Sequence, residues 1–178
     1  LCKCKFCAED AQKMPAEEKM TQDQLYVLFE LAGQEYGVNV QQVLSIERIP
    51  EITRVPRTPD FVVGVMNLRG EVLPVIDLRK RFALESFQGV EVQREQQRII
   101  VVKLEEITVG MVVDMVRDVL SISSDRIEPP PSLVGGIQAE YLDGMAKMGD
   151  RVMVLLNLEK TLSQKEMNEL DEFRGTIS

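Results

Sequence analysis

The sequence has no histidine among its 178 residues. Histidine is the commonest general base and metal ligand in proteins, so its absence excludes Ser–His and Cys–His nucleophilic chemistry. Tryptophan is also absent, and aromatic residues make up 5% of a chain that is 44% hydrophobic. The core must therefore consist mainly of Val, Leu, Ile and Met side chains. Residues 25–178 contain no phosphate-binding glycine motif, catalytic carboxylate pair or metal-ligand set, so we expect no enzyme, no catalytic residue and no cofactor.

Positive charge is in deficit. The chain has 21 Lys and Arg against 29 Asp and Glu, a net charge of −8. This balance argues against binding to nucleic acid or to an anionic membrane surface. No apolar run approaches the length of a membrane span, and no signal peptide is recognisable. We expect a soluble cytoplasmic protein without a nucleic-acid partner and without direct membrane insertion.

Cysteine is confined to Cys2, Cys4 and Cys7, in the spacing C-x-C-x-x-C. The surrounding residues 1–24 have mixed charge and little periodicity, which predicts a flexible N-terminal extension. Three thiolates so close together could form part of a zinc or iron–sulfur site, but four ligands are usual and this chain supplies no fourth. We favour a reduced, exposed tail and expect no metal. A metal- or redox-sensing protein that uses these cysteines is the alternative from another class.

The most informative stretch runs from Phe61 to Phe82, FVVGVMNLRGEVLPVIDLRKRF. Two short apolar runs flank a turn that ends in Gly70, which indicates a β-hairpin whose glycine takes a positive φ. Pro74 cannot donate to a ladder, so its strand is expected at an edge or a bulge. Asp77 is placed to cap a short helix. Arg69 is a cation at the turn of an apolar segment, either solvated or held for a partner.

The second half of the chain repeats the first. Residues 36–40 (YGVNV) match 109–113 (VGMVV), and residues 70–78 match 149–158. Two copies of a five-strand unit predict an all-β fold of two five-stranded barrels with a shared hydrophobic seam. We place the first barrel at about 25–82 and the second at about 97–157. A C-terminal helix at about 158–173 follows, with an apolar face of Leu162, Met167, Leu170 and Phe173.

The hairpin segment resembles the signature of CheW-type chemotaxis coupling proteins through Gly64, Asn67, Leu68, Arg69, Gly70, Leu73, Pro74, Asp77, Leu78 and Arg79. The resemblance covers about residues 25–170. It implies two SH3-like barrels and a non-enzymatic adaptor in the cytoplasm, associated with membrane-bound receptor arrays. Its expected partners are the cytoplasmic tips of methyl-accepting chemoreceptors and the regulatory domain of the histidine kinase CheA. A coupling protein of a related pilus or biofilm pathway and a fragment of the kinase itself are the alternatives within this class.

The resemblance also implies partner-binding residues. They fall on a strand near residue 45, on the hairpin segment and on a later strand that borders the seam: Val43, Ser45, Ile46, Gly64, Val65, Met66, Asn67, Arg69, Gly70, Val116 and Val119. Many relatives carry Glu where this chain has Ser45, and that Glu is expected to pair with the turn arginine. Arg69 is left here with Glu47, Glu71 or Asp77 as candidate partners. An excess of positive charge between Arg48 and Arg81 is suited to an acidic partner. Asp114 and Asp118 are expected to be solvated.

Overall fold

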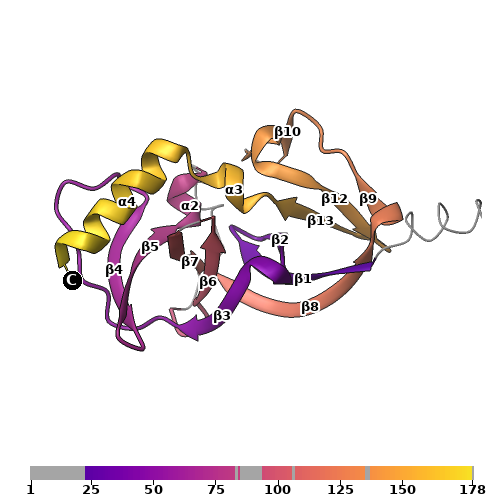
Figure 1. The fold of residues 1–178 in the computed structure, drawn as a ribbon. Coiled ribbons are helices and arrows are strands. Elements are labelled where there is room, and N and C mark those ends of the chain that lie inside the picture. The colour runs from indigo at the N-terminus through magenta and orange to yellow at the C-terminus, as the bar shows by residue number, and fades with distance from the viewer. Residues whose placement is uncertain (1–22, 83, 85–93, 106, 135–136, 178) are drawn as a thin grey trace, which may run out of the picture.

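The computed structural model describes residues 23–82, 84, 94–105, 107–134 and 137–177 (Figure 1). The strands are β1 (Asp23–Leu31), β2 (Gln34–Asn39), β3 (Val43–Arg48), β4 (Val62–Leu68), β5 (Glu71–Asp77), β6 (Arg98–Leu104), β7 (Ile107–Val113), β8 (Met115–Ser123), β9 (Ile127–Glu128), β10 (Leu133–Val134), β11 (Ile137–Gln138), β12 (Leu142–Met148) and β13 (Arg151–Leu156). The α-helices are α2 (Leu78–Arg81), α3 (Leu158–Thr161) and α4 (Gln164–Ile177), and the 3₁₀ turns are η1 (Val40–Gln42), η2 (Ser124–Arg126) and η3 (Ala139–Tyr141). The cysteines and residues 1–22 lie outside the described part, whereas Asp23 and Gln24 of the predicted extension belong to β1.

Each of the two large sheets takes strands from both halves of the chain. Their orders are β8-β1-β2-β13-β12-β9 and β3-β6-β7-β5-β4. The hairpin β1–β2 lies between β8 and β13, and the hairpin β6–β7 lies between β3 and β5 (Figure 1). The all-β class is confirmed, but the contiguous barrels predicted at 25–82 and 97–157 are wrong. Each repeat places its first hairpin in the sheet of the other repeat.

Both sheets close on themselves. The chain leaves β8 through η2 and enters β9, which pairs with β12 at Ile127 and Ala146. In the other sheet, the chain beyond β3 reaches Thr53, whose N–H donates to the Val65 carbonyl and whose carbonyl accepts from the Val65 N–H, both at 2.9 Å. The first and last strand of each sheet are therefore linked through one continuous segment. Closure of this kind removes free sheet edges, and the predicted pair of small barrels is confirmed.

The strand pairing confirms the internal repeat. β2 runs parallel to β13, with Gly37 opposite Leu155, and β7 runs parallel to β5, with Gly110 opposite Val75. Both glycines sit where a side chain would collide. A Cβ on Gly37 would lie 3.0 Å from the Leu155 side chain, and one on Gly110 would lie 2.8 Å from that of Ile99. The two glycines aligned by sequence thus have the same packing role in the two barrels.

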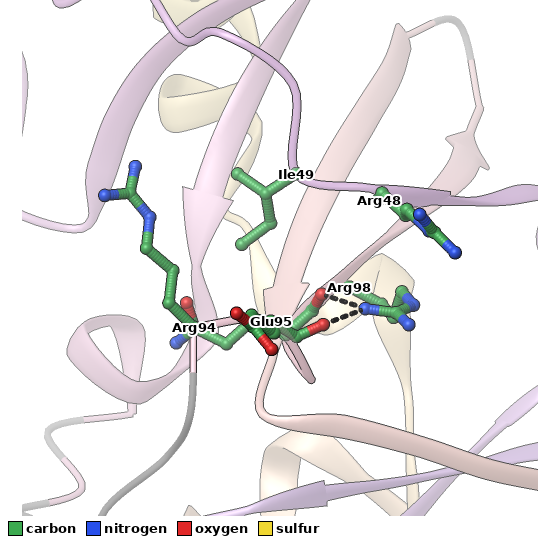
Figure 2. Close-up of a pocket in the computed structure, with 6 residues that line it drawn as sticks. Arg48, Ile49, Arg94, Glu95 and Arg98 are labelled. Atoms are coloured by element: carbon green, nitrogen blue, oxygen red, sulfur yellow. Dashed lines mark hydrogen bonds between the residues drawn. The ribbon is translucent and has the colours of Figure 1, made fainter.

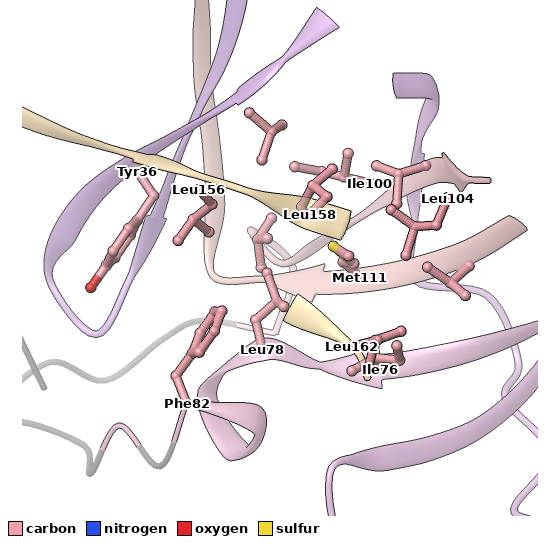
Figure 3. Close-up of a cluster of buried hydrophobic side chains, with 14 of the residues drawn as sticks. Tyr36, Ile76, Leu78, Phe82, Ile100, Leu104, Met111, Leu156, Leu158 and Leu162 are labelled. Carbon is pink, nitrogen blue, oxygen red and sulfur yellow. The ribbon is translucent and has the colours of Figure 1, made fainter. Parts of the chain in front are cut away.

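One apolar cluster joins the two barrels, and it is the shared hydrophobic seam that the sequence predicted. It contains buried side chains from both exchanged hairpins, from the ends of β5 and β13 and from the helices that follow them, among them Tyr36, Ile76, Leu78, Ile100, Met111, Leu156 and Leu158 (Figure 3). A smaller cluster around Leu28 and Met153 fills one barrel, and another around Met66 and Val101 fills the other. Burying each large aliphatic side chain contributes about 1.5–3 kcal/mol. The seam is the largest of the three clusters, so it contributes most of this stabilisation.

The helices are fixed by local capping. The Asp77 carboxylate accepts from the Arg79 N–H at 2.9 Å, as predicted, and the Asn157 side chain caps α3 in the same way. Ser163 and Glu166 form a capping box ahead of α4, because each side chain accepts from the other residue's backbone N–H. The predicted helix at 158–173 is thus two helices with a break at residues 162–163.

The C-terminal helices pack on the seam. Leu162, Met167 and Leu170 are buried there, as predicted, and the Phe173 side chain lies outside the described part. Figure 1 shows α4 lying across the barrel that contains β4 and β5. Arg81 links α2 to α3, because its Nε donates to the Thr161 carbonyl at 2.8 Å.

Tyr36 provides a test of seam burial. Its side chain is 1% exposed and stacks on Phe29 with ring centroids 6.0 Å apart. Burial raises the pKa of Tyr36 from 10.0 to about 12. The folded state therefore favours the neutral phenol, and this contribution is full below pH 10 and is lost as the pH rises toward 12. We expect urea unfolding of Tyr36→Phe to show a shallower loss of stability than wild type between pH 9 and 11.5. Identical slopes would contradict burial of the phenol.

Candidate partner-binding site

The predicted contact strands β3 and β8 occupy corresponding places in the two sheets. Each is the outermost strand of its sheet, and each follows an exchanged hairpin. Val43 at the start of β3 and Val116 near the start of β8 are half-buried and pack against the seam cluster. Figure 1 shows β3, β1 and β8 along the same side of the molecule. The fold therefore places both strands beside the seam, which the resemblance implied for the strand of Val116 and Val119 alone.

Apolar side chains are exposed along these strands. On β3, Ile46 is 39% exposed and Leu44 is 57% exposed, while Ser45 between them is half-buried. On β8 and the adjacent β1, Val119 is 46% exposed and Leu25 is 51% exposed. Four of the five large apolar residues exposed in the described part of the chain thus lie on three strands around the seam. Exposed apolar surface of this kind is typical of protein-binding sites.

Leu44 and Leu25 were missed by the site prediction. The resemblance drew attention to Val43, which packs against the seam cluster, whereas Leu44 and Ile46 on the same strand are exposed. A bulge between Val43 and Ser45 makes Leu44 the extra residue of β3 and leaves Ile46 opposite Ile100. The letters V-L-S-I-E-R do not reveal this bulge, so strict alternation could not have identified Leu44 as exposed. Leu25 also lacks a sequence signal, because the exposed start of β1 has the same apolar pattern as the buried remainder of the strand.

The hairpin turn at Arg69 and Gly70 adopts the predicted geometry. Leu68 pairs with Glu71, and the two residues between them have φ values of 52° and 87°. Positive φ at both central positions is typical of a type I′ turn. The Asn67 side chain accepts from the Gly70 N–H at 2.9 Å, which holds the turn from within. The turn presents Arg69 to solvent.

Two of the three ion-pair partners predicted for Arg69 are excluded by the structure. Among the described residues, Arg69 forms no ion pair with Glu47 or Asp77, and the Asp77 carboxylate is engaged in capping α2.

The position of Pro74 differs from the predicted one, because β5 is an internal strand between β4 and β7. Its ladder to β7 begins one residue later, at Val75, so the missing N–H is tolerated.

A shallow cleft lies next to this hairpin. Its volume is about 420 Å³, and its lining includes Val65, Met66 and Asn67 of β4 together with Pro50, Glu51, Thr53 and Val72. Val65 and Met66 are only 4% and 2% exposed, and Gly64 is also buried. Val65 and Met66 therefore line the cleft with little exposed surface of their own, and Gly64 lies outside the lining. Asn67, Arg69 and Gly70 are the exposed members of the predicted set on this hairpin.

Asp114 was expected to be solvated and is instead buried. It is 5% exposed, and its carboxylate accepts from the Arg79 guanidinium and from the Ala32 N–H at 2.8 Å. Ala32 belongs to the turn of the exchanged hairpin β1–β2, and Arg79 belongs to α2, beside the other barrel. Asp114 therefore joins the two barrels at one end of the seam. Asp118 is exposed on β8, as expected.

Metal-ligand clusters and membrane-spanning helices are absent from the described part of the chain. No group of three or more Cys, Asp or Glu residues there is arranged to hold a metal ion. No described helix has the length and apolar character needed to cross a membrane. Two hairpin-exchanged barrels with apolar side chains exposed beside the seam define a protein-binding module.

Comparisons with known proteins identify the family. A CheW-like domain model matches residues 25–166. The chain is 40% identical over 151 residues to chemotaxis protein CheW of Klebsiella aerogenes, covering 85% of this chain and 89% of that protein. It is 34% identical over 139 residues to chemotaxis protein CheW of Bacillus subtilis, covering 78% and 86% of the two chains. The crystal structure of scaffolding protein TtCheW from Thermoanaerobacter tengcongensis superposes with a TM-score of 0.73 at 32% identity, covering 82% of this chain and 91% of that one. The chain belongs to the CheW family of chemotaxis scaffold proteins.

Proposed function

We propose that this protein is a non-enzymatic adaptor that couples chemoreceptors to the histidine kinase CheA. Membership of the CheW family supports this role, and the observation that carries it is the exposed apolar surface of β3, β1 and β8 beside the seam. Leu44, Ile46 and Val119 offer apolar contacts to one face of an amphipathic helix. The receptor's cytoplasmic tip is the proposed occupant of this surface, which would associate the protein with membrane-bound receptor arrays.

The kinase regulatory domain is proposed to contact a different face. The cleft and turn of the β4–β5 hairpin belong to one barrel alone, and the exposed residues Asn67 and Arg69 are available there. Two separate faces on a single rigid unit hold receptor and kinase in a fixed arrangement. A ligand-driven change in the receptor then shifts the kinase between active and inactive populations through differential contacts.

The proposal is tested by binding measurements with purified proteins. We expect wild type to bind both a receptor cytoplasmic fragment and the kinase regulatory domain. Leu44→Glu should weaken receptor binding at least tenfold, because a charge replaces an apolar contact, and should leave kinase binding within about twofold. Arg69→Ala should weaken kinase binding and spare the receptor. Circular dichroism establishes that each variant is folded.

The matched control for receptor binding is Val152→Glu. Val152 is 37% exposed on β13, away from β3 and β8, so the same charge is introduced outside the proposed surface. Receptor binding that falls equally in Leu44→Glu and Val152→Glu would reject the seam as the docking surface. Failure of wild type to bind either partner would reject the coupling role itself.

A further inference from the structure

A second cleft lies where β3 ends and β6 begins. It has a volume of about 460 Å³ and is lined by Arg48, Ile49, Arg94, Glu95, Gln97 and Arg98 (Figure 2). Three arginines against one glutamate give the lining a charge of +2 in a chain whose net charge is −8. The cleft is distinct from the seam surface and from the hairpin cleft, because it shares no residue with the exposed apolar set or with the Arg69 turn.

Two of these arginines oppose one another. Arg48 on β3 pairs directly with Arg98 on β6 across the antiparallel ladder. Like charges directly opposite each other destabilise a sheet. No ion pair within the described residues relieves Arg48, Arg94 or Arg98. The arrangement therefore costs the free protein stability and leaves a concentration of positive charge without a carboxylate partner.

Arg98 is held in position for binding. Its Nη1 donates to the carbonyls of Glu95 and Gln97 at 2.6 Å and 2.8 Å (Figure 2). These bonds use one nitrogen of a guanidinium that carries five N–H donors, so further donors remain for a ligand. A side chain fixed in this way loses less conformational entropy on binding. Arg48 and Arg94 are exposed and lie on opposite sides of Arg98 (Figure 2).

We propose that this cleft binds a short acidic segment of a partner protein, with its carboxylates on Arg48, Arg94 and Arg98. Guanidinium groups match planar carboxylates in paired hydrogen bonds. Half-buried Ile49 adds an apolar contact for the methylene groups of Asp or Glu side chains. The overall charge of −8 disfavours extended polyanions such as nucleic acid or an anionic membrane, whereas a short segment experiences mainly the local charge.

The test uses fluorescein-labelled hexaglutamate and the full chain, followed by fluorescence anisotropy. We expect saturable binding at 20 mM NaCl that weakens at least fivefold at 200 mM NaCl, because screening reduces the attraction. Arg48→Gln/Arg98→Gln should weaken binding at least tenfold. The control Arg54→Gln/Arg57→Gln removes the same charge from two exposed arginines outside the lining and should change binding less than twofold. Equal loss in both double variants would overturn the proposal, as would absence of binding by wild type.

Competition distinguishes the ligand class. Unlabelled hexaglutamate should displace the probe, whereas inorganic phosphate at the same total charge and ionic strength should not. Displacement by phosphate alone, or tighter binding of a decathymidine oligonucleotide at the same arginines, would overturn the acidic-segment proposal. The seam variant Leu44→Glu should keep full affinity for hexaglutamate, so this test and the coupling test fail independently.

Stability gives a second readout. Arg48→Thr removes one of the opposed charges and introduces a β-branched residue suited to a strand. We expect its urea unfolding midpoint to rise while hexaglutamate binding weakens. A higher midpoint together with weaker binding means that Arg48 contributes to ligand binding while it lowers the stability of the folded protein. A lower midpoint would assign Arg48 a structural role and overturn the proposal.

Discussion

Asp114→Ala is expected to lower the free energy of unfolding by about 3 kcal/mol, because it breaks a buried ion pair and leaves the remaining partners unsatisfied. Its carboxylate is the shared acceptor for the Arg79 guanidinium and the Ala32 N–H. Without this carboxylate, the Arg79 side chain, which is only 22% exposed, loses its ion-pair partner. The Ala32 N–H in the turn of an exchanged hairpin loses its acceptor. Urea unfolding followed by circular dichroism measures the loss.

The control is Asp118→Ala, which removes the same charge four residues further along, on the exposed face of β8. We expect that variant to lie within about 0.5 kcal/mol of wild type. A paired replacement, Arg79→Met with Asp114→Leu, should recover much of the loss, since exchanging both charges for apolar groups avoids an isolated buried cation. A small effect of Asp114→Ala would mean that the junction between the barrels is held by the seam alone.

Local features of the fold were predictable from the sequence. The positive φ at Gly70 and the cap at Asp77 follow from residues within a few positions of each other. The equivalence of Gly37 and Gly110 was visible because each repeat keeps its own short pattern. The seam followed from size, because neither small barrel can bury enough apolar surface alone.

The exchange of hairpins was not predictable in this way. Strand patterns specify which face is buried and do not specify which distant strand lies alongside. β1 and β2 have the same alternation whether they pair with β3 or with β8. The role of Asp114 was hidden for a related reason, since its partner Arg79 lies 35 residues away and the adjoining strands read as solvated on one face.

The sequence could propose which segments carry the candidate site, but it could not show which of their side chains are exposed. Family resemblance selected the strands β3 and β8 and the β4–β5 hairpin, but it could not separate side chains that face solvent from those that build the barrel. Met66 and Leu44 are both large and apolar, and only the fold shows that Met66 is 2% exposed and Leu44 is 57% exposed. The arginine cleft depends on the register of β3 against β6, which places Arg48 opposite Arg98.

Gly64→Ala is expected to destabilise the protein by about 3 kcal/mol, because the added methyl group meets main chain. Gly64 has a φ of 155°, and a Cβ there would lie 2.2 Å from the Thr53 carbonyl oxygen. Thr53 is the residue whose two hydrogen bonds to Val65 close this barrel. The substitution therefore opposes closure directly, and the backbone at residues 52–53 must move away from β4.

The second barrel supplies a matched counterpart. Gly144 lies at the corresponding crossing, where a Cβ would be 2.7 Å from the Ile127 side chain and 2.8 Å from the Glu128 carbonyl oxygen. The main-chain oxygen is 2.8 Å from this Cβ, against 2.2 Å at Gly64, so the backbone has less far to move and Gly144→Ala should cost less than Gly64→Ala. Gly70→Ala provides the control for backbone conformation alone, since its φ is 87° and no heavy atom lies within 4 Å of the added Cβ. Its cost should be about 1 kcal/mol.

The expected order of urea midpoints is therefore wild type, Gly70→Ala, Gly144→Ala and Gly64→Ala, from highest to lowest. Kinase binding adds a functional readout, because a methyl group on Gly64 would displace Thr53, which lines the cleft with Val65 and Met66. At a temperature where each variant remains folded, Gly64→Ala should weaken kinase binding, while Gly144→Ala in the other barrel should not. If Gly64→Ala proved no less stable than Gly70→Ala, contact between β4 and Thr53 could not be what closes the barrel. A stability loss in the predicted order with unchanged kinase binding would instead separate barrel closure from the proposed kinase surface.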